Sequence, residues 1–298
     1  MNTQWLQGTG VAVVTPFSNK GEVDISALRR IVDHLIQGGV DYLVALGTTG
    51  EPATLTKQEK QLVLETIIDQ NAGRLPLILG AGGNNTREVL GNIVQESKRK
   101  DIAGFLSVSP YYNKPTQEGL FQHYKAIASC TDLPVILYNV PGRTATNMSA
   151  ETTLQLAHSC QNIVAIKEAS GDLTQCMNIL RHCPRDFRLI SGDDHLSLPL
   201  ISIGASGVIS VAANGFPAVF SNMIRLALAG DFSQARAIHY QLLELMRLNF
   251  AEGNPAGVKA LLEHQGIAEK EVRLPLVNVS DELSQQLIRA WNEVFPSR

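Results

Sequence analysis

The sequence has no long apolar run, no basic cluster and few cysteines, and each of these absences excludes a class of protein. No apolar run is long enough to cross a bilayer, and residues 1–17 do not combine a basic start with an apolar core. With a net charge of -3, the chain offers no basic footprint for nucleic acid. We therefore expect a cytoplasmic protein that binds neither nucleic acid nor a membrane.

Cysteine and histidine are also too scattered for a disulfide framework or a metal site. The four cysteines show no C-x-x-C spacing, so we expect buried, reduced thiols without a function at Cys130, Cys160, Cys176 and Cys183. Asp193 and Asp194 stand side by side but lack histidine partners, and we expect no metal there. Residues 80–83 look like a nucleotide loop, but Asn85 occupies the place of the last fingerprint glycine, which argues against dinucleotide binding.

What the chain does contain is a repeating unit of a short apolar run, a turn and an amphipathic helical pattern. Eight apolar runs predict β-strands at residues 10–15, 42–47, 75–80, 104–108, 135–139, 163–167, 187–191 and 207–211. Apolar residues three and four apart predict helices between them, such as residues 26–37, 57–70, 86–99 and 116–129. Eight such units predict an α/β fold, a (β/α)8 TIM barrel, with a doubly wound sheet as the alternative.

The chain is longer than the barrel requires. After a glycine and a capping aspartate at residues 230–231, three more helical patterns follow, at residues 232–249, 255–264 and 281–293. We therefore expect two parts: a barrel over residues 1–230 that carries the active site, and a C-terminal helical region over residues 231–298 that serves packing or assembly.

One predicted strand ends on an unusual residue. Residues 163–166 are apolar and mostly β-branched, which is typical of a parallel strand buried on both faces, and the strand ends on Lys167. Alternation places Ala165 and Lys167 on the same face, so the small Ala165 leaves room for the lysine stem. Removing an ammonium from water favours the neutral amine, which can attack a carbonyl and form an imine. A lone lysine at a strand end more often reaches solvent, so the neighbouring motifs decide between these interpretations.

In a TIM barrel the loops after the strands meet at one rim and carry the chemistry. The turn at residues 47–50, Gly-Thr-Thr-Gly, offers hydroxyls and backbone N–H groups that can hold a small carboxylate. Tyr138 and the pair at residues 111–112 supply phenols, which can pass a proton when linked to a hydroxyl such as that of Thr48. Arg143 offers a planar fork suited to a second carboxylate. Each motif alone also fits a capped turn, a core tyrosine or a surface arginine.

Together the motifs resemble the dihydrodipicolinate synthase family, within the pyruvate-dependent class I aldolase and lyase superfamily. The resemblance runs from about Thr9 to the C-terminal helices. Its superfamily motifs are residues 47–51, Tyr138 with Lys167, and residues 207–210. Its synthase motifs are residues 109–112 and 138–144. The resemblance implies a TIM barrel, usually a homotetramer built as a dimer of dimers, that condenses pyruvate with L-aspartate 4-semialdehyde on the diaminopimelate route to lysine.

The resemblance also implies a catalytic role for four side chains. Lys167 would form the Schiff base with pyruvate, and Tyr138 would be the proton donor and acceptor. Thr48 and Tyr112 would complete a proton relay, with Tyr112 reaching the site of a neighbouring subunit. No cofactor is implied, because the imine itself is the electron sink.

For the substrates, the resemblance implies that Thr49 and the backbone at Ile209 bind pyruvate and that Arg143 binds the carboxylate of the semialdehyde. Two alternatives stay open. An N-acetylneuraminate lyase or keto-deoxy-sugar aldolase would use the same lysine, but Arg143 argues against it because a sugar aldehyde needs no second carboxylate clamp. A non-catalytic barrel that binds a keto acid would not need the intact pair of Lys167 and Tyr138.

A regulatory site is implied as well. In relatives that lysine inhibits, the allosteric cleft lies at a subunit interface, and the matching positions here are Pro52, Ala53, Lys57, Lys60, Asn84, Glu88 and Tyr111. Such relatives often carry imidazoles where this chain has Lys57 and Lys60, and two ammonium groups repel the amines of the effector. We therefore expect weak or absent inhibition by L-lysine.

Overall fold

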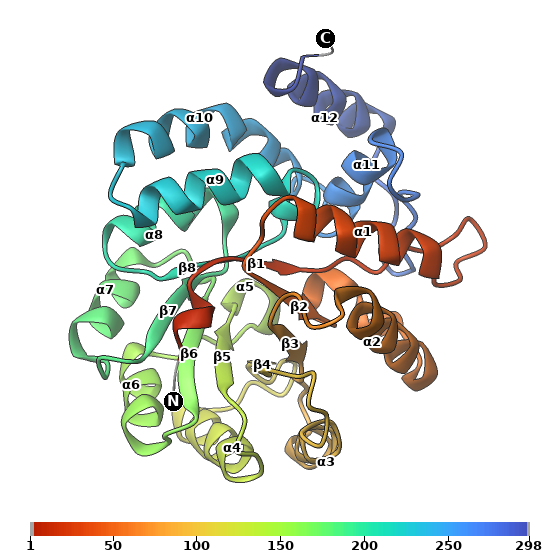
Figure 1. The fold of residues 1–298 in the computed structure, drawn as a ribbon. Coiled ribbons are helices and arrows are strands. Elements are labelled where there is room, and N and C mark those ends of the chain that lie inside the picture. The colour runs from red at the N-terminus through yellow and green to blue at the C-terminus, as the bar shows by residue number, and fades with distance from the viewer. Residues whose placement is uncertain (1–2, 297–298) are drawn as a thin grey trace.

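Eight parallel strands close into a barrel in the computed structural model, which describes residues 3–296 (Figure 1). The strands pair in chain order and β8 closes against β1. They are β1 (Gly8–Ala12), β2 (Tyr42–Ala45), β3 (Leu77–Gly80), β4 (Gly104–Val108), β5 (Val135–Asn139), β6 (Ile163–Glu168), β7 (Arg188–Ser191) and β8 (Gly207–Ser210). The predicted TIM barrel is confirmed, and the doubly wound sheet is excluded because an open sheet has two edge strands, whereas each strand here pairs with two neighbours.

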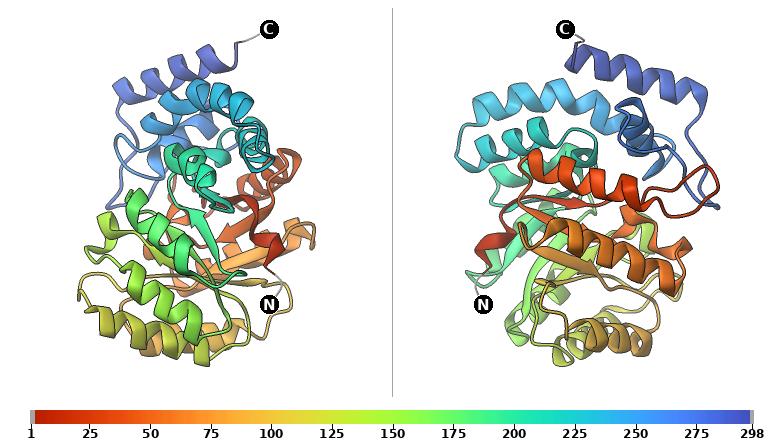
Figure 2. Two further views of the ribbon diagram at one scale, coloured as in Figure 1. Left: turned by 90° about the vertical axis from the view of Figure 1, so that its left-hand side faces the viewer. Right: turned by 45° about the vertical axis from the view of Figure 1, so that its right-hand side comes forward.

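Helices surround the barrel and continue beyond it (Figure 2). Those that follow the strands are α1 (Ile25–Gln37), α2 (Lys57–Asn71), α3 (Thr86–Glu96), α4 (Gln117–Ser129), α5 (Pro141–Thr144), α6 (Ala150–Ser159), α7 (Leu173–His182), α8 (Ser197–Ser202) and α9 (Pro217–Leu228). Helices α2 and α3 begin where predicted because a polar side chain accepts a hydrogen bond from a first-turn N–H, as Thr56 and Asn85 do. In the described residues, none of the helices combines the length and the apolar character that a bilayer crossing requires.

Strand residues alternate between two apolar cores. In β6, Ile166 points outward and packs with the residues beneath the helices, whereas Ala165 points inward. Ile190 and Ile209 fill the same inner core. Lys167 follows this alternation, because its amine lies beside the inward-facing Tyr138. The predicted shared face of Ala165 and Lys167 is therefore confirmed.

The C-terminal helices α10 (Phe232–Leu248), α11 (Ala256–His264) and α12 (Asp281–Val294) lie together beyond α9 and α1 (Figure 1). α10 packs against both α9 and α12, and α11 packs against α12. Gly230 has a φ of +85°, and the side chain of Asp231 caps α10. The predicted break at this point is confirmed.

Several predictions about local structure need correction. The first strand is Gly8–Ala12 and not residues 10–15, and the helix predicted at residues 86–99 ends at Glu96. Three of the four cysteines are only half-buried, because Cys130, Cys160 and Cys183 stand at the C-terminal ends of helices, where the chain nears the surface. The second strand ends at Ala45 and not at residue 47, because Leu46 adopts a left-handed conformation with a φ of +55°.

Candidate active site

The ends of β5 and β6 bring Tyr138 and Lys167 together inside the barrel. The two residues are register partners, and they are 6% and 4% exposed. The Lys167 Nζ atom lies 4.4 Å from the centroid of the Tyr138 ring. Imine formation requires a nucleophile and a proton carrier. The amine of Lys167, shielded from bulk water, can be the nucleophile, and the neighbouring phenol of Tyr138 can be the proton carrier.

A polar network immediately behind this pair ties the two strand ends together. Asn139 and Glu168 are the next register partners, and Asn139 Nδ2 donates to Glu168 Oε1 at 3.1 Å. Gln175 Nε2 donates to Glu168 Oε2 at 2.9 Å. Burial raises the pKa of the Glu168 carboxyl, and these hydrogen bonds act in the opposite direction. The network therefore fixes the spacing of the tyrosine and the lysine one position earlier.

The turn after β7 borders the lysine stem. A Cβ atom on Gly192 would lie 3.1 Å from Lys167 Cε and 2.6 Å from the Cβ of Ala169, so glycine leaves the space that the stem occupies. Burial raises the pKa of the next carboxyl, Asp193, and the positive charges of Lys167 and Arg143 act in the opposite direction. Asp193 thus lies within the electrostatic reach of both cationic site residues.

The neighbouring Asp194 has a structural role in which no metal is needed. Its carboxylate accepts a hydrogen bond from Ser210 Oγ at 2.5 Å and another from the Ala212 N–H at 2.9 Å. It therefore holds the turn that follows β8 against the turn that follows β7. Ile209, predicted to bind pyruvate through its backbone, lies in β8 with its side chain in the inner core.

The Gly-Thr-Thr-Gly turn forms a short 3-10 helix, η2 (Thr48–Gly50), directly after β2. Thr48 is half-buried and Thr49 is buried. Thr49 Oγ1 accepts a hydrogen bond at 3.1 Å from Nδ2 of Asn254, which lies in the loop between α10 and α11. Asn254 Oδ1 is buried and has no partner among the described residues. The C-terminal region therefore contributes directly to the site.

Arg143 and Tyr112 lie at the exposed rim. Arg143 belongs to α5, and its guanidinium makes no hydrogen bond or close ion pair among the described residues. Tyr112 is 89% exposed and has a φ of +71°, a conformation that is rare for tyrosine. Within the described part of the chain, no hydrogen bond joins Tyr112 to Thr48 or Tyr138, so one chain alone does not assemble the predicted relay.

The positions matched to a lysine cleft fall in two groups, and all are at least partly exposed in one chain. The first group lies on the loops after β3 and β4 and in the first turn of α3, and the two loops are joined by a hydrogen bond of 3.3 Å from Asn84 Nδ2 to the Tyr111 carbonyl. It comprises Asn84, Glu88 and Tyr111. The second group lies in η3 (Pro52–Thr54) and the first turn of α2, and it comprises Pro52, Ala53, Lys57 and Lys60.

Comparison with known proteins decides the family. Residues 6–293 match the model of the dihydrodipicolinate synthetase family. The chain belongs to this family. It is 54% identical to 4-hydroxy-tetrahydrodipicolinate synthase of Flavobacterium psychrophilum over 283 residues. The matched region covers 94% of this chain and 95% of the relative.

Two solved structures of dihydrodipicolinate synthases have the same fold. The chloride-inhibited enzyme from Acinetobacter baumannii, complexed with pyruvate, is 40% identical, with a TM-score of 0.93 over 97% of this chain and 99% of that one. The enzyme from Cyanidioschyzon merolae with lysine bound is also 40% identical, with a TM-score of 0.93 over 98% of this chain and 99% of that one. The resemblance drawn from the motifs is confirmed at the level of the family.

Four residues of this synthetase-family site were not predicted from the sequence. Asn139, Glu168 and Gly192 stand inside the motifs, and their signal is a polar or small residue at the end of an apolar strand. Asn254 has no local signal, because its partner lies 205 positions earlier in the chain.

Proposed function

We propose that this protein is a 4-hydroxy-tetrahydrodipicolinate synthase, which condenses pyruvate with L-aspartate 4-semialdehyde on the diaminopimelate route to lysine. The observation that carries the proposal is the position of the buried Lys167 amine. It lies inside the closed barrel, 4.4 Å from the centroid of the Tyr138 ring. The family membership and the curated relatives of that name support it.

The chemistry begins at Lys167. Its neutral amine attacks C2 of pyruvate, and loss of water leaves a protonated imine. This cation withdraws electrons from the methyl group, so a methyl proton leaves and an enamine forms without any cofactor. The enamine carbon attacks the aldehyde carbon, and the amino group of the semialdehyde then attacks C2 and releases Lys167. Tyr138 carries the protons of these steps, and Thr48 and Tyr112 connect it to solvent.

Two carboxylates must be held in this reaction. Thr49 and the backbone at Ile209 hold that of pyruvate, which places C2 next to Lys167. Arg143 holds that of the semialdehyde, and its guanidinium, unpaired within residues 3–296, supports this role. This second clamp separates the proposal from the sugar aldolases.

The relay also requires a second subunit. Tyr112 is almost fully exposed in one chain, and it lies in a strained conformation on the loop after β4. We propose that it enters the site of a neighbouring subunit and that the protein forms a homotetramer, a dimer of dimers.

Reductive trapping tests the proposal. Borohydride reduction in the presence of pyruvate should give one adduct, located by peptide mapping on Lys167 and absent from a Lys167→Arg variant. Lys270→Met, a change at a surface lysine, is the matched control and should trap normally. A coupled assay should then show turnover of aspartate semialdehyde and none of N-acetylneuraminate. An adduct on another lysine would contradict the mechanism, and turnover of the sugar alone would contradict the substrate.

A further inference from the structure

The glutamate that follows the threonine turn is held by the C-terminal region. Glu51 is C-terminal to η2 and adopts a left-handed conformation with a φ of 51°. Its Oε1 atom accepts from Lys259 Nζ at 2.5 Å, and its Oε2 atom accepts from the backbone N–H of Arg273 at 3.1 Å. Both side chains of the Glu51–Lys259 pair are 1% exposed. The turn is thus joined to residues more than 200 positions later in the chain.

Lys259 is fully satisfied in this buried position. Besides Glu51, its ammonium donates to the Glu271 carbonyl at 2.8 Å and lies 4.3 Å from the centroid of the Phe17 ring. Burial lowers the pKa of Lys259 to about 8, and the charge of Glu51 opposes this shift. An ammonium with three directed contacts has one orientation only, and so does the carboxylate that it holds.

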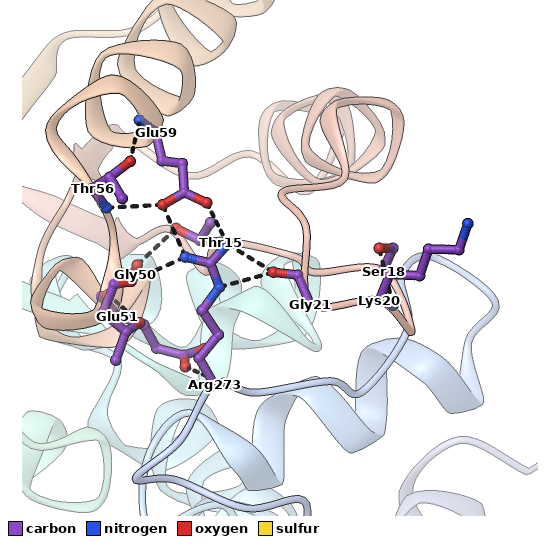
Figure 3. A network of polar contacts seen from close by, with 10 residues as sticks. Thr15, Ser18, Lys20, Gly21, Gly50, Glu51, Thr56, Glu59 and Arg273 are labelled. Atoms are coloured by element: carbon purple, nitrogen blue, oxygen red, sulfur yellow. Dashed lines mark hydrogen bonds and ion pairs between the residues drawn. The ribbon is translucent and has the colours of Figure 1, made fainter.

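Arg273 extends the same contact to the elements on either side of the turn. Figure 3 shows its guanidinium between Glu59 of α2 and the carbonyl of Gly21 in the loop after β1. It also donates to the Thr54 carbonyl at 3.0 Å. Together with the contact from Asn254 to Thr49, residues 254–273 of the C-terminal region hold the turn at its threonines and after them.

Stability alone does not account for a buried ion pair. Burial of two charges costs desolvation energy, and well-packed apolar residues of similar volume often stabilise a fold as well or better. What a pair with directed hydrogen bonds adds is a fixed geometry. The backbone of the turn shows what is fixed, because the Glu51 N–H donates to the Thr48 carbonyl at 3.1 Å and Thr15 Oγ1 donates to the Gly50 carbonyl at 2.7 Å.

We propose that Glu51 and Lys259 are positioning residues, through which the C-terminal region holds Thr48 and Thr49 in the geometry that pyruvate binding and proton transfer require. The proposal rests on the function assigned above to these threonines. It also gives the C-terminal region a task in catalysis, beyond packing or assembly.

The test uses the full-length protein and a double variant in which neither charge remains, Glu51→Gln with Lys259→Met. Because no unpaired charge is left buried, its melting temperature should stay close to that of the wild type. We expect kcat to fall about 10- to 100-fold and the KM for pyruvate to rise, because a displaced hydroxyl is no longer aligned with the reacting atoms. The KM for the semialdehyde should stay unchanged, because Arg143 is not affected.

Lys270→Met is again the control, since it breaks an exposed ion pair with Glu263 in the same region and should leave both constants unchanged. If the double variant does not fold, Arg273→Leu with Glu59→Leu tests the partly exposed outer contact, and the same two constants should change, to a smaller extent. Wild-type kinetics in either variant would overturn the proposal. Failure of the proposed function is distinguishable, because the wild type itself would then form no imine with pyruvate or would not turn over aspartate semialdehyde.

Discussion

Backbone strain in this protein is concentrated at residues of the candidate site. Five of the six described non-glycine residues with positive φ lie in the loops after β2, β4 and β5: Leu46, Glu51, Tyr112, Lys114 and Ala145. Each such residue costs about 1–3 kcal/mol, which the surrounding contacts must offset. For Glu51 the compensating contacts are the buried hydrogen bonds from Lys259 and Arg273. No sequence pattern predicts such a conformation for these side chains.

At Gly192, the smallest possible addition should impair the chemistry. In Gly192→Ala the new methyl group lies 2.6 Å from Ala169 Cβ and 3.1 Å from Lys167 Cε, so the end of β6 and the lysine stem must both adjust. We expect pyruvate imine formation to slow about tenfold or more, because small displacements of a nucleophile are costly. Overpacking should cost only about 1–3 kcal/mol of unfolding free energy. Gly91→Ala, with no atoms within 4 Å of the new methyl, is the control. Unchanged trapping kinetics would show that the stem has spare room.

Arg143 should matter for the second substrate only. Arg143→Ala removes a charge-assisted contact with the semialdehyde carboxylate, which should cost about 2–4 kcal/mol in kcat/KM for that substrate. Imine formation with pyruvate should proceed as in the wild type, as borohydride trapping can measure. The exposed Arg185 offers a control substitution to alanine on the surface. Unchanged use of the semialdehyde would make Arg143 structural and would strengthen the case for a sugar aldolase.

At the scale of elements, sequence reasoning was most accurate where turn residues flank an apolar run on both sides. The bounds of β4 and β5 were predicted to the residue, because apolar runs and flanking turns define them. The first strand was displaced: it was predicted at residues 10–15 and is Gly8–Ala12. Two glycines in β1 weaken the apolar pattern at the start of this strand. The apolar residues after Ala12 continue the pattern beyond its end. Hydrophobicity alone does not record where backbone pairing stops.

The start of α2 should confer a measurable pH dependence on stability. Its capping glutamate, Glu59, bonds the N-cap Thr56 and also pairs with Arg273, and the hydrogen bond from Arg273 contributes most to lowering its pKa from 4.5 to about 2. Since the folded pKa lies below the unfolded value, this contribution is fully present above pH 4.5 and is lost as the pH falls toward 2.

Glu59→Gln should therefore be less stable than the wild type above pH 4.5, and the difference in unfolding free energy should shrink toward pH 2. Urea denaturation at a series of pH values measures this difference. The matched control in the same helix is Glu65→Gln. The Glu65 side chain is 55% exposed, and its Oε1 atom lies 3.5 Å from Arg99 Nη2. It should show no comparable trend. A constant difference for Glu59→Gln across the range would show that the contact with Arg273 does not depend on charge.

At the scale of the whole molecule, the family motifs predicted the candidate site but not what supports it. Lys167 and Tyr138 stand out because each lies at the end of an apolar strand. Asn254, Lys259 and Arg273 lie in a part of the chain that was predicted to serve only packing or assembly. Their partners are 205 to 222 positions away, and only the closed fold brings them to the threonine turn.

Feedback by lysine is predicted to be weak in this protein. A relative of the same fold binds lysine in its crystal structure. In this chain we expect Lys57 and Lys60, both in α2, at two positions of the corresponding cleft. Their positive charges should repel an effector with two amines, so we expect less than half inhibition at about 1 mM L-lysine. Lys57→His with Lys60→His should increase inhibition above pH 7, where imidazole is mostly neutral. Strong inhibition of the wild type below 1 mM would contradict this prediction.

The proposed exchange of Tyr112 between subunits is testable by mixing two inactive variants. Lys167→Arg lacks the nucleophile and Tyr112→Phe lacks the relay phenol, so each alone should have little activity. In a hybrid pair, however, the site with the intact Lys167 receives an intact Tyr112 from its neighbour. If subunits associate at random, half of the pairs are hybrids with one complete site of two, so activity should recover to about a quarter of wild type. Mixing Lys167→Arg with Tyr138→Phe is the control and should not restore activity, because both groups come from one chain. No recovery after verified subunit exchange would place Tyr112 in the site of its own chain or outside the reaction.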